Sequence, residues 1–226
     1  MNMRAIACAR EHRYGFGTMQ DGQDTHDRAG GSRTLWLDAA RAAFLAGGVD
    51  AVKVQPLGAT LGLSRTSFYW VFKDRDALLS ALLDDWEATN TRALRVGAEA
   101  YAETLPEAVL NLISVFLDEA RFVPRYEMAM RGWAHRSDTV AARVAQNDAD
   151  RLDAIRAMFA RFGQPATEAD VRARTVYLVQ MGYIALQTRE TLAERLRRVP
   201  DYVRTFAGTP ATAAEIARFL ARHPPG

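Results

Sequence analysis

The sequence predicts an all-α protein in which a small three-helix unit is followed by a larger helical bundle. Beyond residue 32, apolar residues recur at helical spacing, and no run alternates as a strand would. Residues that cap helices separate these stretches, and Gly62 followed by Ser64 marks a tight turn between two short helices. With 226 residues, 49% of them hydrophobic, the chain is long enough for a small domain joined to a larger one. We divide it into residues 1–32, 33–80 and 81–226.

Residues 1–32 are expected to form a disordered leader or arm. They are rich in Gly, Asp, Arg and His without a helical period, and Asp21-Gly22 and Gly30-Gly31 are turn signals. The only cysteine, Cys8, lies in this stretch, which excludes an internal disulfide. The leader lacks the apolar centre of a secretion signal, and no apolar run reaches the roughly 20 residues that span a bilayer. We therefore expect a soluble, cytoplasmic protein with no membrane partner.

Residues 33–80 are expected to form a helix-turn-helix domain. The first helix ends at Gly47-Gly48, which is a strong stop signal, and the second runs from about Val54 to Leu61. The third begins directly after Ser64, whose side chain can accept a hydrogen bond from the exposed amides of the first turn. Asp74 can cap a fourth, longer helix that begins near Arg75.

The third helix carries residue types that contact double-stranded DNA. Thr66 and Ser67 are small and polar, Arg65 can donate to guanine or phosphate, and Phe68 and Phe72 are expected to face inward. Residues 51–73 include three basic residues and no acidic one, although the net charge of +2 is too small to indicate nucleic acid by itself. The candidate DNA contacts are Arg33, Gln55, Ser64, Arg65, Thr66, Ser67, Tyr69, Trp70, Lys73 and Arg75.

Two of these candidates have open alternatives. Arg33 can reach a minor groove, as in several helical DNA-binding domains, or belong to a loose leader. Trp70 can contact DNA at the surface or pack in the core, as an aromatic residue beside a buried Phe often does. Because adjacent helical residues point in different directions, Trp70 is expected to leave the side that Phe68 and Phe72 occupy.

A connected pattern runs through this domain: Gly48-Val49-Asp50, then Leu57-Gly58-x-x-Leu61-Gly62-Leu63-Ser64, then Phe68-Tyr69-Trp70-x-Phe72-x-Asp74-Arg75-Asp76-x-Leu78-Leu79. With this pattern, the stretch from Thr34 to Trp86 resembles the TetR family of bacterial transcriptional regulators. The resemblance implies that the third helix enters the major groove, and that Tyr69, with residues near Lys73 and Arg75, holds phosphates. Two positions depart from the pattern. Val71 stands where many members carry His or Tyr, and Gly58 replaces the usual Ala.

Residues 81–226 are expected to form a helical domain for effector binding and dimerisation. The helix from Val171 to Thr188 is apolar on more than one face, which predicts a place in the middle of the domain or against its twin in a dimer. The resemblance implies a four-helix homodimer interface, here built from residues 168–188 and 210–222. Between them we expect a broken, Arg-rich stretch containing Pro200. Helix-turn-helix dimers bind paired half-sites, so a palindromic operator is expected.

The middle helices carry the candidate ligand-binding residues. Asp148 and Arg151 fall on or beside the apolar stripe of the helix from Asp138 to Phe162, and a buried acid needs a partner such as Arg151 or Arg131. One hypothesis is that five residues line or border a pocket for a small-molecule effector, mostly apolar or aromatic: Arg131, Trp133, Asp148, Tyr177 and Met181. The alternative is a satisfied ion pair that stabilises helix contacts.

The sequence favours a homodimeric DNA-binding transcription factor, a repressor that a small molecule releases from its operator. We find no Gly-rich phosphate loop between strand and helix, no nucleophile elbow and no metal-ligand spacing around His135, so no enzyme activity, catalytic residue, metal or cofactor is expected. One alternative is a helical small-molecule-binding or enzymatic protein whose helix-turn-helix is purely structural. Another is an activator or architectural DNA binder without an effector.

Overall fold

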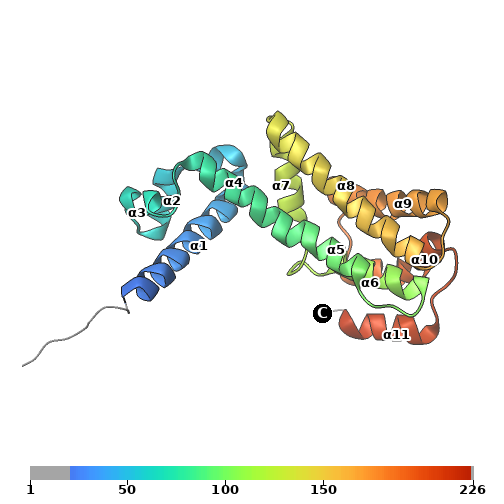
Figure 1. Cartoon of the computed structure of the whole chain (residues 1–226). Coiled ribbons are helices and arrows are strands. Elements are labelled where there is room, and N and C mark those ends of the chain that lie inside the picture. Colours follow the sequence, from blue (N-terminus) through green and yellow to red (C-terminus); the bar gives the residue numbers. More distant parts are fainter. Residues whose placement is uncertain (1–20, 225–226) are drawn as a thin grey trace, which may run out of the picture.

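The computed structural model describes residues 21–224, with side chains from residue 33 onward. Within this range all regular elements are helices, which confirms the predicted fold class (Figure 1). The N-terminal unit comprises α1 Asp21–Gly47, the 3-10 turn η1 Val49–Ala51, α2 Val54–Leu61, α3 Arg65–Tyr69 and α4 Arg75–Trp86. The bundle comprises the π-helical turn η2 Glu87–Thr91, α5 Arg92–Glu99, α6 Leu105–Leu117, α7 Pro124–Ala134, α8 Asp138–Arg161, α9 Ala166–Ala185, α10 Leu192–Ala207 and α11 Ala213–Arg222.

The first helix is longer than the sequence predicts. It begins at Asp21, so residues 21–32 belong to α1 and not to a disordered leader. A packed helix can extend past weak helix formers because each added residue gains a backbone hydrogen bond without a new nucleation step. The first turns of α1 project away from the rest of the molecule (Figure 1). The remainder of the predicted leader, residues 1–20 with Cys8, lies outside the described residues.

Local signals place the short helices of the N-terminal unit as predicted. Gly62 ends α2 in the left-handed conformation, with φ 65°. The Ser64 side chain accepts a hydrogen bond from the Ser67 amide, and Asp74 does the same for the amide of Ala77 at the start of α4. Gly58 also has a packing reason: a Cβ there would lie 3.2 Å from the Trp36 ring and 3.0 Å from the Leu63 carbonyl oxygen.

Two hydrophobic cores hold the molecule together. The first lies among α1 to α4 and continues into Tyr126 and Met130 of α7 and Val140 and Val144 of α8. The second is formed mainly by α5, α6, α9, α10 and the last turns of α8. Since α7 and α8 contribute to the core of the N-terminal unit, they join that unit to the bundle.

A continuous helical rod connects the two cores, because α4, η2 and α5 follow one another without a loop (Figure 1). The π-helical turn η2 buries Asn90 and Thr91. Asn90 donates to the Val123 carbonyl oxygen at 3.1 Å and accepts from the Val123 amide at 3.0 Å, which ties the rod to the start of α7. Turns of this kind often occur at functional positions in longer helices.

The stretch around Pro200 is helical, contrary to the prediction of a broken segment. Thr191 and Glu194 form a capping box at the start of α10, and Leu196, Val199, Val203 and Phe206 are buried on one face. A proline inside a helix costs about 3 kcal/mol through its missing amide hydrogen and its ring. Burial of four large apolar side chains, at roughly 1.5–3 kcal/mol each, outweighs that cost.

The two segments predicted to mediate dimerisation differ in their surroundings. α9 buries Val176 and Tyr177, whereas a stripe on its opposite side is exposed in the single chain: Val171, Thr175, Leu178 and Ala185. α11 packs against α6 through Phe219 and Glu215, whose carboxylate accepts a hydrogen bond from Thr104. Among residues 21–224, no helix combines the length and hydropathy that crossing a bilayer requires.

Candidate nucleic-acid interface and ligand cleft

α3 is held to the N-terminal core by its aromatic residues. Phe68 is fully buried, and its ring meets Trp36 edge-on and stacks on Phe72, with centroid distances of 5.1 Å and 5.6 Å. The opposite side of α3 faces outward, where Arg65 and Thr66 are exposed. Trp70 leaves the core side entirely and is 82% exposed, the surface position that was one of its two alternatives. The helix therefore presents a free polar and aromatic surface.

Basic side chains surround this surface. Arg33, Lys53, Arg65 and Lys73 are exposed, and none of them forms an ion pair within the part of the chain whose side chains are described. The Arg33 guanidinium lies 4.9 Å from the centroid of the Phe72 ring, which fixes it beside the end of α3. Arg65 donates to the Tyr69 hydroxyl at 3.1 Å. We call these four residues the basic surface.

Three further predicted DNA contacts have partners inside the protein. The Ser64 hydroxyl caps α3, and the Ser67 hydroxyl donates to the Ser64 carbonyl oxygen at 2.7 Å. Arg75 donates to the carbonyl oxygens of Val52 at 2.6 Å and Val49 at 2.7 Å. Arg75 therefore fastens the start of α4 to the turn η1, a role that the sequence did not predict. The other candidates, including Gln55, are exposed.

A polar cluster fills the interior between α7, α8 and α9, and we define it as Glu127, Arg131, Asp148, Arg151 and Tyr177. Arg151 and Glu127 are fully buried and form an ion pair at 2.8 Å. Arg131 donates to Glu127 at 2.7 Å and to both oxygens of Asp148 at 2.7 Å and 3.0 Å. The Tyr177 hydroxyl donates to Asp148 at 2.6 Å.

The charged groups of this cluster stabilise one another in their ionised forms. Burial alone would raise the pKa of Glu127, but the neighbouring guanidinium groups of Arg151 and Arg131 hold that pKa below its usual value. Burial raises the pKa of the Tyr177 hydroxyl, which keeps it a neutral donor. Glu127 also accepts hydrogen bonds from Trp86 and Asn90, at 3.0 Å and 3.2 Å, so the cluster contacts the helical rod.

Four of the five predicted ligand-binding residues meet in or beside this cluster. Arg131 pairs with Asp148, as the ion-pair alternative requires, and its Nη2 atom lies 3.6 Å from the Met181 sulfur. The sequence reasoning missed Glu127, although its spacing of four residues from Arg131 on one helix was a usable signal. In residues 33–224, no group of three His, Cys, Asp or Glu side chains is placed to hold a metal.

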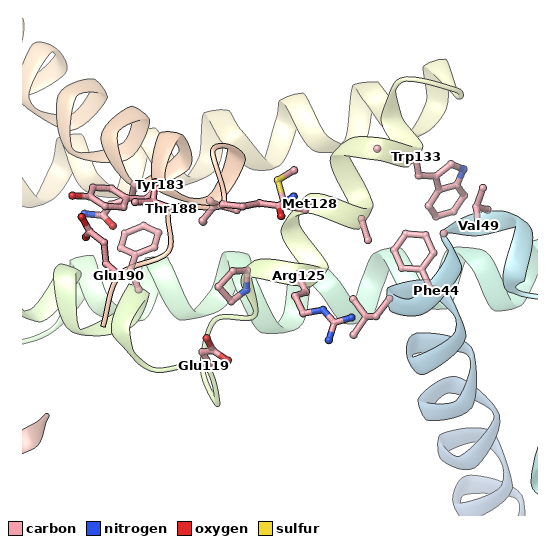
Figure 2. A pocket seen from close by; sticks show the side chains of 18 of the residues that line it. Phe44, Val49, Glu119, Arg125, Met128, Trp133, Tyr183, Thr188 and Glu190 are labelled. Atoms are coloured by element: carbon pink, nitrogen blue, oxygen red, sulfur yellow. The ribbon is translucent and has the colours of Figure 1, made fainter. Parts of the chain in front are cut away.

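The fifth residue, Trp133, lies elsewhere and lines a cleft of about 780 Å³ on the outer face of α7. At one end the cleft is closed by the end of α1 and by η1, where Phe44 meets Trp133 edge-on at 5.8 Å. At the other end are Tyr183 and Thr188, near the end of α9 (Figure 2). Arg131, Asp148, Tyr177 and Met181 do not line it, because they point to the side of α7 that packs on α8 and α9.

Comparison with known proteins identifies the N-terminal unit. Residues 37–82 match the sequence model of the "Bacterial regulatory proteins, tetR family". An HTH-type transcriptional repressor of Mycobacterium tuberculosis is 31% identical over 121 residues, which is 52% of this chain and 65% of that protein. The chain thus spans just under two thirds of the length of this curated relative.

Solved structures share the fold over most of the chain. A putative TetR-family transcriptional regulator from Mesorhizobium loti has a TM-score of 0.56 at 19% identity, covering 86% of this chain and 98% of its own. GusR of Salmonella enterica has a TM-score of 0.55 at 17% identity, covering 84% and 94%. AmtR of Mycobacterium smegmatis has a TM-score of 0.56 at 19% identity, covering 83% and 91%. At these identities the likeness concerns the fold alone.

Proposed function

We propose that this chain, whose N-terminal domain belongs to the tetR family of bacterial regulatory proteins, is a transcriptional repressor that binds operator DNA as a homodimer. The observation that carries the proposal is the outer side of α3, where Arg65, Thr66 and Trp70 are exposed beside cations that lack an acidic partner among the described residues. A surface that served only packing would not combine exposed aromatic and polar residues with uncompensated positive charge. We place its site of action with the chromosome, in the cytoplasm.

In this proposal α3 lies in the major groove. Thr66 and Arg65 face the base edges, with Arg65 suited to guanine or phosphate. Lys73, Lys53 and Arg33 lie where they can contact the phosphates on either side of the groove, and such contacts position a protein without specifying sequence. The hydrogen bond between Arg65 and Tyr69 orders the arginine before DNA is bound, which reduces the entropy lost on binding.

A homodimer is supported by the exposed apolar stripe of α9. Val171 and Leu178 are 57% and 60% exposed in the single chain, and they lie two helical turns apart on one side. A twofold-symmetric pair would bury this stripe against its own copy and place two α3 helices on one face of the duplex. A palindromic operator follows from that symmetry.

Release by a small molecule is the regulatory part of the proposal. The rod of α4, η2 and α5 joins the DNA-binding domain to the bundle, so a ligand that favours another tilt of this rod changes the separation of the two α3 helices. Specific binding requires both half-sites and is then lost. Nonspecific binding depends mainly on phosphates and is weakened less.

A fluorescence-anisotropy titration of the full chain tests DNA recognition. The probes are the DNA flanking its own gene and an unrelated duplex of equal length, measured over a range of salt concentrations. We expect tighter binding to the flanking DNA, with affinity that falls steeply as salt rises. Arg65→Met should weaken binding to the flanking DNA by about 10-fold or more, because a base-edge contact contributes about 1–3 kcal/mol.

Arg197→Met is the matched control, since Arg197 is exposed on α10, far along the chain from α3. It should leave the affinity unchanged, and both variants should melt as the parent protein does. Equal affinity for the two duplexes, or an equal effect of the two substitutions, would instead favour a helical ligand-binding protein whose helix-turn-helix is structural.

A further inference from the structure

The cleft on the outer face of α7 contains groups that lack partners inside the protein. Gln180 is only 6% exposed and lines the cleft, yet its amide forms no hydrogen bond with any described residue. The amide atoms of Gln180 are reached by solvent through the cleft, since they are not among the buried atoms without a partner, and they are therefore free to donate to and accept from a bound molecule. At the same end, the Oε2 atom of Glu190 is buried without a hydrogen bond, while its Oε1 atom pairs with Arg198. The cleft therefore offers both hydrogen-bond donors and acceptors to a bound molecule.

The walls of the cleft are aromatic and apolar. Phe44 and Trp133 form one end, Tyr183 lies toward the other, and Met128 is between them (Figure 2). Phe116 also lines the cleft. Aromatic faces and a flexible thioether suit a flat, largely apolar molecule of drug-like size. The volume of about 780 Å³ is sufficient for such a molecule.

The charges that line the cleft leave a positive excess. Arg136 is neutralised by Asp50 at 2.6 Å, and Glu190 by Arg198, also at 2.6 Å. Two of the arginines that line the cleft, Arg125 and Arg195, form no ion pair with a described residue. Among the acidic residues that line it, only Glu119 lacks such an ion pair. The Arg195 guanidinium lies 5.5 Å from the centroid of the Tyr183 ring, so a cation is held beside an aromatic wall.

We infer that this cleft is the effector site of the repressor, and that its ligand is an aromatic or largely apolar molecule with one anionic group. The inference rests on the proposed function and specifies where the small molecule that releases the repressor binds. The anionic group lies near Arg195, the ring system lies between Trp133 and Tyr183, and Gln180 forms a hydrogen bond with the ligand. The polar cluster behind α7 does not line the cleft and is not part of the proposed ligand site.

The cleft contacts the DNA-binding domain directly. Val49 lines it, and the carbonyl oxygen of the same residue accepts a hydrogen bond from Arg75, the first residue of α4 after the α3 segment. A ligand that displaces the turn η1 therefore shifts the start of α4 and, with it, α3. The ion pair between Arg136 and Asp50 spans the same junction.

Two fluorescent probes with the same ring system test the chemistry of the site. 1-Anilinonaphthalene-8-sulfonate carries an anionic sulfonate, and N-phenyl-1-naphthylamine is its neutral counterpart. We expect the sulfonate to bind the full chain saturably and at least 10-fold more tightly than the neutral amine. Arg195→Met should remove this preference and leave the affinity for the neutral probe within twofold. A similar loss for both probes, or no preference in the parent protein, overturns the anionic assignment.

A blocking variant tests the place of binding. Gly132 lines the cleft, and a Cβ added there meets no atom within 4 Å, so the side chain of Gly132→Leu begins in open space at the cleft. Helix propensity favours both Leu and Ala over Gly, so the fold is not threatened. We expect Gly132→Leu to weaken sulfonate binding by 10-fold or more and Gly132→Ala to leave it unchanged. Unaltered binding to Gly132→Leu, with the melting temperature preserved, overturns the site.

Separate readouts distinguish failure of the site from failure of the proposed function. Probe binding is measured without DNA, and DNA binding is measured without probe. Saturating sulfonate should lower the operator affinity of the parent protein but not that of Gly132→Leu. If the parent protein binds DNA specifically but Gly132→Leu binds the probe as tightly as the parent does, the cleft is not the ligand site and the repressor function stands. If the probe binds in the cleft but the protein binds both duplexes equally well, the repressor function is rejected and the ligand site stands.

Discussion

Glu127 is a fully buried carboxylate whose two oxygens accept hydrogen bonds from four side chains: Trp86, Asn90, Arg131 and Arg151. These partners come from α4, η2, α7 and α8, so one carboxylate connects the rod to the bundle. Removal of one member of a buried ion pair leaves an uncompensated charge and costs about 3–5 kcal/mol. The stability of the bundle should therefore depend on the ionised form of this residue.

The substitution Glu127→Gln should lower the free energy of unfolding by about 3–5 kcal/mol at pH 7. Because the pKa of Glu127 is depressed in the folded protein, its stabilising contribution is present above the ordinary glutamate pKa of about 4.3 and is lost as pH falls through the folded value. The difference in the free energy of unfolding between the parent protein and Glu127→Gln should thus become smaller from about pH 5 downward. Urea unfolding between pH 7 and pH 3 measures it.

The matched control is Glu119→Gln, since Glu119 is exposed and forms no ion pair with a described residue. Its unfolding curve should follow that of the parent protein at every pH. A gap between Glu127→Gln and the parent that stays constant or widens on acidification would show that the carboxylate charge does not stabilise the fold.

At the scale of elements, α5 and α6 pack closely because Gly97 has no side chain. A Cβ at this position would lie 2.5 Å from a methyl group of Val115, which is itself fully buried. This close approach lets the last turns of the rod pack directly on α6. Gly97 therefore has a packing role, although alanine is the better helix former.

Gly97→Ala should destabilise the protein by about 1–3 kcal/mol through overpacking. Val115→Ala should relieve the clash, so the double variant is expected to be more stable than the sum of the single effects predicts. Chemical denaturation of the four proteins gives this coupling. Strict additivity, or a stabilising Gly97→Ala, would mean that α5 and α6 are free to move apart.

The elements that sequence reasoning predicts well are those with local signals. Ser64 and Asp74 cap their helices through side chains that are three residues from the amides they bind. The sequence reasoning missed α10 because it took Pro200 as a helix breaker and overlooked the apolar residues at helical spacing on either side of it. The polar cluster was only partly predictable, since Glu127, Asp148 and Tyr177 come from three helices whose pairing no local pattern specifies. Of the predicted ligand-binding residues, only Trp133 lines the cleft. The cleft forms between elements that are distant in sequence, so no local pattern indicates its other residues.

At the scale of the whole molecule, the proposed function requires two DNA-binding domains at a fixed separation. The exposed stripe of α9 is the surface proposed to hold the dimer, and Leu178 lies in the middle of it. The charged groups of α9, such as the pair Arg174 and Asp170, neutralise each other at its edge. An apolar stripe with a charged rim is a typical composition for an interface between subunits.

Leu178→Glu should convert the dimer to a monomer and weaken operator binding, because a carboxylate at the centre of the interface would be buried without a partner. Light scattering after size-exclusion chromatography measures the mass. Val96→Glu is the control, since Val96 is 46% exposed on α5 and lies outside the stripe. It should remain a dimer. A Leu178→Glu protein with the parent mass would place the interface elsewhere.

Recognition of DNA by the outer side of α3 is tested most directly by hydrogen exchange of the full chain, alone and with the duplex that it binds most tightly. We predict slower amide exchange in residues 61–75 with this duplex, a weaker effect with unrelated DNA of equal length, and no comparable change in α10 or α11. Unchanged exchange in residues 61–75 under saturating DNA would contradict a DNA-reading role for α3.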